Sequence, residues 1–144
     1  MIRKSILALA AFPLAACVVV PDAPNVTSTP WPEGSAVKLK QSVSVGDVVV
    51  TPIRIVEDSR CPINARCVWA GRLVVETRIA AGGWRDTANI TLGETYGTHG
   101  HVIALSEASP DKEAQRELQP GDYRLTYRDG AWNTQTDPGP PLSQ

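Results

Sequence analysis

The sequence predicts an all-β fold in which one small β-sandwich forms the folded domain. Apolar and polar residues alternate with a period of two in several short segments, and turn signals rich in glycine and proline separate these segments. No segment has the 3.6-residue apolar periodicity of a convincing helix. About six strands at such short spacing are typical of a sandwich or a barrel. We expect the domain to span residues 36–132.

The first two predicted strands are expected to form a hairpin. Residues 37–45 alternate between apolar and polar side chains, and only Gln41 interrupts the apolar row. Gly46-Asp47 then turns the chain into residues 48–56, which are rich in β-branched side chains. Thr51-Pro52 within this second strand predicts an edge position or a β-bulge, because proline has no N–H to donate to a ladder.

A second pair of strands is predicted on either side of Ala81-Gly82-Gly83, which is a hairpin turn signal. The first strand of this pair is expected at residues 68–80 and the second at residues 84–92. One face of the first strand carries the side chains that we expect to point inward, namely Leu73, Val75, Thr77 and Ile79.

The C-terminal part of the domain is predicted to contain two further strands. A loop rich in Gly, Thr and His is expected at residues 93–100, and a short strand follows at residues 101–105. The charged residues 111–117 suggest one helical turn. A last strand follows Pro120-Gly121, with Tyr123, Leu125 and Tyr127 at alternate positions.

Tyr123 directly follows a Pro-Gly turn signal and begins an aromatic strand. This arrangement resembles the tyrosine corner of immunoglobulin-like sandwiches, in which a tyrosine near the start of a late strand bonds back to nearby backbone. The resemblance implies an immunoglobulin-like sandwich or a similar Greek-key fold. It also implies that the Tyr123 hydroxyl donates to backbone close to it in sequence.

The N-terminus has the parts of a secretion signal. Two basic residues precede an apolar segment at residues 6–12, and Leu14-Ala15-Ala16-Cys17 follows. The apolar segment is too short to cross a bilayer as a helix, which takes about 20 residues. These residues resemble the lipobox of bacterial prolipoproteins. The resemblance implies that residues 1–16 are removed and that Cys17 is acylated with chains such as palmitate, which anchor the protein to a membrane.

The residues after the lipobox predict where the anchor places the domain. In the lipoproteins that the lipobox resembles, an Asp after the cysteine tends to retain the protein at the inner membrane. Val18 occupies that position here and favours the outer membrane, with the domain facing the periplasm. Residues 17–35 are rich in Pro, Ser and Thr and predict a disordered tether, and residues 133–144 predict a disordered tail.

The charge balance excludes some classes of partner. The chain has 14 basic and 15 acidic residues, and loss of Arg3 and Lys4 with the signal leaves 12 basic residues. These basic residues are scattered, whereas nucleic acid and anionic lipid headgroups need a dense basic patch. We therefore expect a monomer that has no nucleic-acid partner and that contacts the membrane through its lipid anchor.

Three cysteines are present, and assigning Cys17 to lipid leaves Cys61 and Cys67 as a pair. In an oxidising envelope two cysteines at this short spacing are expected to form a disulfide bond. A two-ligand metal clip and a redox pair are alternative interpretations, although the C-x5-C spacing differs from the C-x2-C of thioredoxin-like and zinc sites.

The segment from Asp58 to Gly71 has the pattern D-S-R-C-P-x4-C-x-W-A-G. It resembles a motif of small, uncharacterised bacterial secreted proteins and lipoproteins, which implies an envelope location and a disulfide bond but no activity. Two interpretations of its side chains are open. Trp69 shares a strand face with Cys67 and packs over the bridge. Alternatively, the loop presents a preorganised recognition surface made of Asp58, Arg60, Arg66 and Trp69.

His99 and His101 are the only histidines of the chain and lie two positions apart. In extended backbone both imidazoles would face the same way and bind copper or zinc, but the pair lacks the third and fourth ligands of a tight site. A solvent-exposed polar loop is the alternative. The sequence contains no serine-hydrolase, P-loop or dinucleotide motif, so neither an enzyme nor a cofactor is predicted.

These features predict a membrane-anchored bacterial envelope lipoprotein that acts as a non-enzymatic binding or structural module. Two alternatives stay open. One is a periplasmic metal-binding protein that uses His99 and His101. The other is an inhibitor or chaperone-like partner of another envelope protein, which it would contact through the loop that contains Cys61.

Overall fold

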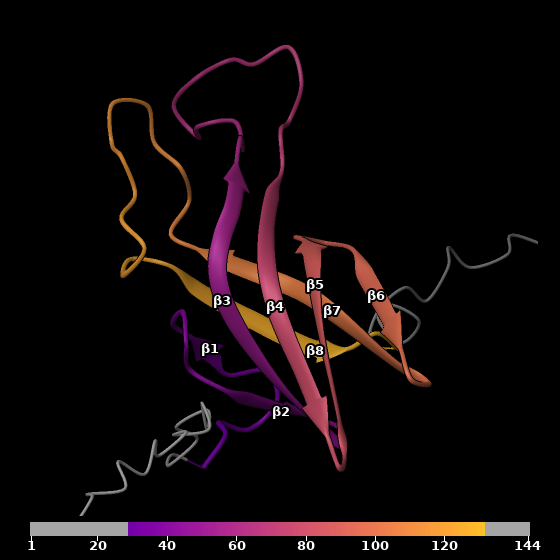
Figure 1. Cartoon of the computed structure of the whole chain (residues 1–144). Helices are drawn as coiled ribbons and strands as arrows, with labels where there is room; N and C mark the ends of the chain where they lie inside the picture. The colour runs from indigo at the N-terminus through magenta and orange to yellow at the C-terminus, as the bar shows by residue number, and fades with distance from the viewer. Residues whose placement is uncertain (1–28, 132–144) are drawn as a thin grey trace, which may run out of the picture.

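Two antiparallel four-stranded sheets pack face to face in this computed structural model, which describes residues 29–131 (Figure 1). The first sheet has the order β2-β3-β4-β5, with strands at Val43–Val45, Val48–Asp58, Leu73–Ala81 and Trp84–Thr91. The second sheet has the order β1-β8-β7-β6, with strands at Ala36–Val37, Arg124–Asp129, His101–Ser109 and Thr95–Thr98. Residues 29–131 contain no helix. The prediction of an all-β sandwich is confirmed.

The core lies between the two sheets, where alternate residues of each strand point inward. The largest fully buried side chains come from seven of the strands and from both sheets, and they include Val37, Val43, Val50, Leu73, Val75, Ile79, Ile90, Ile103, Leu105, Leu125 and Tyr127. Burying such side chains removes apolar surface from water, which stabilises the folded state by about 25 cal/mol for each Å² buried. The period-two pattern of the sequence therefore correctly identifies the faces that form the core.

The predicted strand at residues 37–45 is wrong in one respect, because the chain changes sheets within it. Lys40 has a positive φ of 66° and separates β1 from β2. β1 pairs with β8 in the second sheet, whereas β2 pairs with β3 in the first. Val37 and Val43 are both fully buried, so the two halves supply the same core from opposite sides. Apolar and polar residues alternate in the same way whether the chain forms one continuous strand or passes from one sheet to the other, so the pattern could not reveal the crossing.

The second predicted strand is confirmed as β3 and extends to Asp58. Its pairing with β4 shifts register between Pro52 and Arg54, and again between Ile55 and Glu57. The β-bulge that Thr51-Pro52 predicted is therefore present. A bulge leaves an unpaired residue on one strand and increases the local twist.

β4 begins later than predicted. The sequence pattern suggested a strand from residue 68, but β4 starts at Leu73, and the side chain of Val68 is fully exposed. The inward face from Leu73 to Ile79 is buried as expected. A run of apolar residues cannot by itself distinguish a strand from a loop that a disulfide bond constrains.

Residues 93–100, which we expected to form a loop, contain the edge strand β6. β6 pairs with β7 through the two-residue turn His99-Gly100, in which φ is 49° and 81°. Positive φ at both central residues is the requirement of a type I′ hairpin turn. β7 also continues beyond the predicted end at residue 105, to Ser109.

Two further boundaries differ from the predictions. Residues 111–117 form no helical turn, and the Arg116 N–H donates to the Glu113 carbonyl within an irregular loop. Residues 31–35, which we assigned to the tether, belong to the folded part. The Trp31 N–H donates to the Ser42 carbonyl at 2.8 Å, and the Gly34 N–H donates to the Tyr127 carbonyl at 3.2 Å. The signal segment, Cys17 and the predicted tail at residues 133–144 lie outside the described residues.

A polar pair inside the core aligns the two sheets. The hydroxyls of Thr77 on β4 and Tyr127 on β8 lie 2.8 Å apart, and both residues are fully buried. The Thr77 hydroxyl also donates to the Val75 carbonyl at 3.3 Å, so Tyr127 is the donor toward Thr77. Burial raises the pKa of Tyr127 far above its ordinary value, and the neutral phenol is therefore the form that the core contains.

The Thr77–Tyr127 pair predicts a non-additive result in a double-mutant cycle. Thr77→Val removes the partner of a buried hydroxyl and is expected to destabilise the protein by about 1 to 3 kcal/mol. Adding Tyr127→Phe removes the unsatisfied hydroxyl and is expected to restore part of this loss, because replacing both partners by apolar groups is nearly neutral. Urea denaturation of the wild type, both single variants and the double variant measures the coupling. Additive losses would show that the pair does not interact.

Candidate functional site at the disulfide loop

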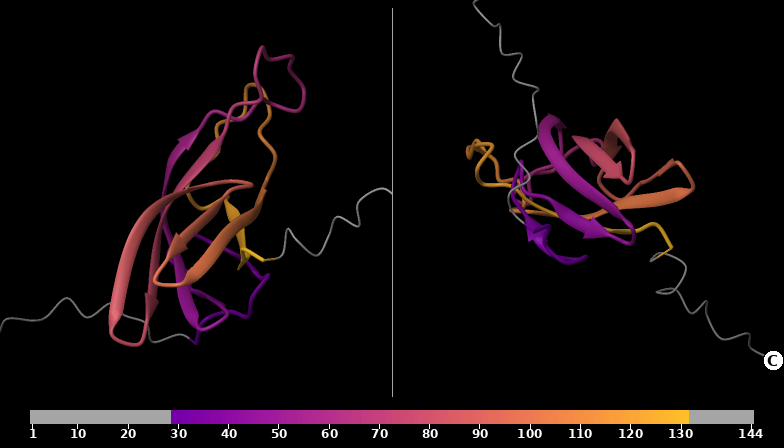
Figure 2. Two further views of the ribbon diagram at one scale, coloured as in Figure 1. Left: turned by 90° about the vertical axis from the view of Figure 1, so that its right-hand side faces the viewer. Right: turned by 60° about the horizontal axis from the view of Figure 1, so that its bottom comes forward.

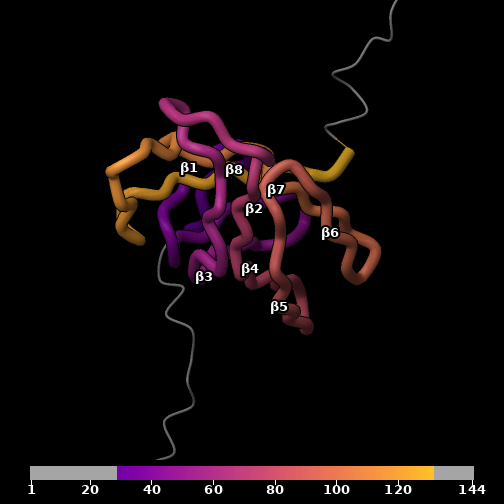
Figure 3. Tube along the Cα trace, turned by 90° about the horizontal axis from the view of Figure 1, so that it is seen from above, coloured from indigo at the N-terminus to yellow at the C-terminus, as the bar shows by residue number. Residues whose placement is uncertain are grey.

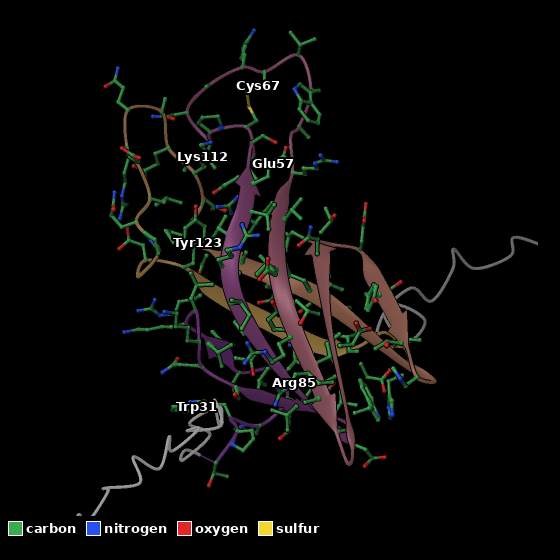
Figure 4. The ribbon with its side chains drawn as sticks, in the orientation of Figure 1. Trp31, Glu57, Cys67, Arg85, Lys112 and Tyr123 are labelled. Atoms are coloured by element: carbon green, nitrogen blue, oxygen red, sulfur yellow. A yellow bond between two sulfur atoms is a disulfide. The ribbon has the colours of Figure 1, made fainter. Side chains whose placement is uncertain are left out.

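The chain between β3 and β4 projects beyond the end of the sandwich (Figure 1). We call residues 59–72 the disulfide loop, because Cys61 and Cys67 form a disulfide bond whose Cα atoms are 5.9 Å apart. Cys67 lies near the outer end of this loop (Figure 4). The predicted disulfide bond is confirmed, and the metal-clip and redox-dithiol interpretations do not describe the pair in this state.

The stem of the disulfide loop continues the ladder between β3 and β4. The Ser59 N–H donates to the Arg72 carbonyl and the Cys61 N–H donates to the Ala70 carbonyl, each at 2.8 Å. Gly71 has a φ of 68°, and a Cβ at this position would lie 1.8 Å from the Ser59 carbonyl oxygen. Glycine is therefore required at Gly71 for the two sides of the stem to approach each other.

Asp58, at the end of β3, accepts hydrogen bonds from two other side chains. The Arg60 guanidinium donates to both carboxylate oxygens, at 2.9 and 2.8 Å, and the Tyr123 hydroxyl donates at 2.8 Å. The Asp58 and Arg60 side chains are only 10% and 13% exposed. A paired, hydrogen-bonded carboxylate tolerates such burial, whereas an unpaired one is costly.

These contacts also change the acidity of both partners. Partial burial raises the pKa of Asp58, but the hydrogen bonds from Arg60 and Tyr123 and the Arg60 charge outweigh it, so the pKa lies below the ordinary value. For Tyr123, burial and the hydrogen bond to Asp58 raise the pKa to about 12. Asp58 is therefore ionised and Tyr123 is neutral at neutral pH.

The predicted tyrosine corner is wrong in its bonding partner. The Tyr123 hydroxyl donates to the side chain of Asp58, 65 positions away in sequence, and not to nearby backbone. Tyr123 leads into β8 of the second sheet, whereas Asp58 ends β3 of the first. The bond therefore connects the two sheets at the end where the disulfide loop begins. Sequence spacing carries no signal for a partner so distant.

A second loop, residues 110–122, lies beside the disulfide loop at the same end of the sandwich, and we call it the buttress loop (Figure 2). Lys112 of the buttress loop bonds both to the end of β3 and to the disulfide loop. Its ammonium group donates to the Asp58 carbonyl at 2.7 Å, and its own carbonyl accepts from the Ile63 N–H at 2.9 Å. The Asn64 side chain accepts from the Ala114 N–H at 2.7 Å. The buttress loop thus supports the disulfide ring from one side.

The outer end of the disulfide loop exposes large apolar side chains. Ile63 is 68% exposed, Trp69 is 64% exposed and Val68 is fully exposed. We call these three residues the apolar tip. Arg66 lies between the two bridged cysteines and is also exposed. Several large apolar side chains exposed on one braced loop are a candidate interaction surface.

The structure divides the four residues of the predicted recognition surface into two pairs. Asp58 and Arg60 form a largely buried salt bridge at the base of the disulfide loop, so they support the loop and do not form its outer surface. Arg66 and Trp69 are exposed. The alternative in which Trp69 packs over the bridge from a strand face is wrong, since no strand includes it. Sequence reasoning missed the exposure of Ile63 and Val68, because apolar side chains are ordinarily expected to be buried.

The apolar tip belongs to a loop that projects beyond the end of the sandwich (Figure 1). Two shallow hollows, each of about 360 Å³, lie elsewhere, and none of the tip residues lines them. Small-molecule sites are concave and bury most of their ligand. The tip therefore suits contact with a macromolecule better than capture of a small ligand.

His99 and His101 lie away from the disulfide loop, at the turn between β6 and β7. The extended backbone that we assumed for the pair is wrong, because His99 occupies the left-handed region within this turn. Both rings lie near Trp84, with centroids 4.1 and 6.0 Å from the indole. Within residues 29–131, no group of three or more His, Cys, Asp or Glu side chains is arranged to hold a metal ion.

Comparisons with known proteins identify no relative. No protein-family model matches the chain, and no curated protein or solved structure is significantly similar to it. In the part of the chain that the structure describes, no helix has the length and apolar character needed to cross a membrane. The function is therefore inferred from the residues and geometry of the chain itself.

The Asp58 contacts predict a specific pH dependence of stability. Because the folded-state pKa of Asp58 is lowered, its contribution is fully present above its ordinary pKa and is lost as the pH falls through the folded-state value. Asp58→Asn is expected to destabilise the protein by about 1 to 3 kcal/mol at neutral pH. The difference from wild type should shrink below about pH 4. Urea denaturation over a pH series measures it.

Asp47→Asn is the matched control for this experiment, because Asp47 is an exposed carboxylate in the β2–β3 turn. It is expected to change stability by less than about 0.5 kcal/mol. A wild-type stability at neutral pH in the Asp58→Asn variant would contradict the role of Asp58, and so would a difference that persists unchanged in acid.

Proposed function

We propose that the protein is a lipid-anchored bacterial envelope lipoprotein that acts as a non-enzymatic binding module. Its binding element is the apolar tip of the disulfide loop, and its partner is another envelope protein. The exposure of Trp69, of its chain neighbour Val68 and of Ile63 on one braced loop is the observation that carries this proposal.

The composition of the tip supports a protein partner. Trp and Arg are enriched among the residues that dominate the energy of protein interfaces, and Trp69 and Arg66 are both exposed here. The disulfide bond and the buttress loop order the tip before binding. Such preorganisation reduces the entropy that association loses, so a small contact area gains affinity.

The position of the tip supports a partner away from the anchoring membrane. Trp31 and Cys67 lie at opposite ends of the molecule (Figure 4). Lipid on Cys17 would reach the domain through Trp31, and the 14 intervening peptide steps span at most about 50 Å. The tip therefore faces away from the end that the anchor approaches. With Val18 after the cysteine favouring the outer membrane, the partner is expected in the periplasm.

The lipid anchor predicts a simple labelling result. Cells that produce the full chain are expected to incorporate labelled palmitate into the wild-type protein and not into the Cys17→Ser variant, because the thiol is the acylation site. Gel fluorography or click detection of the purified protein measures the label. Absence of label on wild type, or equal label on both proteins, would refute lipidation.

The apolar tip predicts a cross-linking result in the envelope. A photoreactive amino acid at position 63 is expected to capture one dominant protein. Trp69→Ala and Arg66→Ala should each reduce this capture at least tenfold, as expected for an anchor worth more than about 1.4 kcal/mol. Because both residues are exposed, their unfolding free energies should stay within about 0.5 kcal/mol of wild type.

Trp31→Ala is the matched control for the tip. Trp31 is 54% exposed and lies at the other end of the sandwich, so its loss removes a similar exposed indole without touching the tip. It should leave capture unchanged. Equal capture by the Trp69→Ala and wild-type proteins would refute recognition through the tip, and cross-links to lipid alone would show that the tip contacts a bilayer instead.

A further inference from the structure

Six side chains gather where β5 of the first sheet meets β6 and β7 of the second. β5 and β6 lie at the same edge of the molecule (Figure 3). We call this group the histidine cluster, and it consists of Trp84, Asp86, Tyr96, Thr98, His99 and His101. It is remote from the disulfide loop and does not depend on the function proposed for the apolar tip.

Hydrogen bonds within the cluster determine which nitrogen of His99 carries its proton. Asp86 accepts from the Thr98 hydroxyl at 2.7 Å and from the Tyr96 hydroxyl at 3.0 Å. The hydrogen bond from Thr98, and to a smaller extent the one from Tyr96, lowers the pKa of Asp86. The carboxylate is therefore ionised and accepts both bonds. The single proton of the Thr98 hydroxyl points to Asp86. Thr98 must therefore accept from Nδ1 of His99, which lies 2.9 Å away.

This tautomer leaves Nε2 of His99 with a free lone pair. The ring is also held in place, because it stacks on Trp84 with centroids 4.1 Å apart and an angle of 11° between the planes. His99 is exposed, so a ligand in solvent can approach it. Metal-binding histidines are usually oriented by a hydrogen bond from their other ring nitrogen; here the Thr98 hydroxyl accepts that bond and is itself held by Asp86.

His101 supplies a second imidazole beside the same indole. Its ring centroid lies 6.0 Å from that of Trp84, and the residue is half-buried. Across residues 29–131, no hydrogen bond or ion pair engages its ring nitrogens. Neutral imidazole nitrogens are good ligands for copper and zinc.

We propose that Nε2 of His99 and a ring nitrogen of His101 bind one divalent transition-metal ion, Cu²⁺ or Zn²⁺. Two protein ligands leave the remaining coordination positions to water or to a partner's side chain, so the ion is exchangeable and is held less tightly than in a closed three- or four-ligand site. Cu²⁺ should bind more tightly than Zn²⁺, following the general order of divalent affinities. Thr98 is a positioning residue, since it acts on the metal through His99.

Isothermal titration of the full-length mature protein with copper or zinc salts tests this proposal. The protein must lack a histidine tag, and its two histidines then provide a clean background. We expect saturable binding of one ion per chain. His99→Asn and His101→Asn should each weaken binding at least tenfold. Asn tolerates the left-handed backbone at position 99, so the turn should be kept.

Thr98 variants test the positioning role. Thr98→Val should weaken binding about 10- to 100-fold, and Thr98→Ser should restore it, because Ser keeps the hydroxyl between Asp86 and His99. Nitrogen-15 NMR of the metal-free protein should show His99 protonated at Nδ1, and Thr98→Val should abolish that preference. A merely structural role of Thr98 would not change the tautomer.

Two results would overturn the proposal. One is the absence of saturable binding to the wild-type protein. The other is equal binding by wild type and by a double variant with Asn at both histidine positions, which would assign the ion to the chain terminus or to surface carboxylates. Trp69→Ala should bind the metal as wild type does, and this result would separate the histidine cluster from the apolar tip.

Discussion

The hydrogen-bonded carboxylate of Asp58 is the contact on which the end of the molecule that carries the disulfide loop depends. It accepts from Arg60 within the disulfide loop and from Tyr123, which directly precedes β8, while Lys112 of the buttress loop donates to the backbone carbonyl of Asp58. Three chain segments therefore meet at one residue. Because the site is largely shielded from water, each charged hydrogen bond there is stronger than it would be at the surface, and an unpaired group would be costly.

This arrangement separates support from contact. The polar side chains of Asp58 and Arg60 are largely buried and brace the loop, whereas the apolar side chains of the tip are exposed to solvent. The reverse distribution would be expected of a loop whose only task is to connect two strands. A disulfide ring, a glycine that only fits without a Cβ, and a buttress loop all restrict the same short segment. A rigid apolar protrusion is a suitable element for recognising another protein.

The sandwich provides two separate surfaces at different places. The apolar tip lies at one end, and the histidine cluster lies at the edge where the two sheets meet. In the core between them, the Thr77–Tyr127 bond fixes the alignment of the sheets.

Local patterns in the sequence by themselves predicted the all-β class, the inward faces of the strands, an edge position or a bulge at Pro52, and the pairing of Cys61 with Cys67. Each of these depends on neighbours in the chain, through side-chain alternation, the missing N–H of proline or the short distance between two thiols. Which strands share a sheet could not be deduced, as the crossing at Lys40 shows, because alternation is the same on either side of a core.

Only the tertiary structure decided what lies opposite each side chain. It assigned Tyr123 to Asp58, exposed Trp69, and brought Thr98, His99 and Asp86 together from two strands in different sheets. Sequence reasoning grouped Asp58, Arg60, Arg66 and Trp69, but it could not tell which of these side chains are shielded and which are exposed. The physical reason is that burial and hydrogen-bond partners depend on residues far away in the chain, whereas sequence patterns report the preferences of near neighbours.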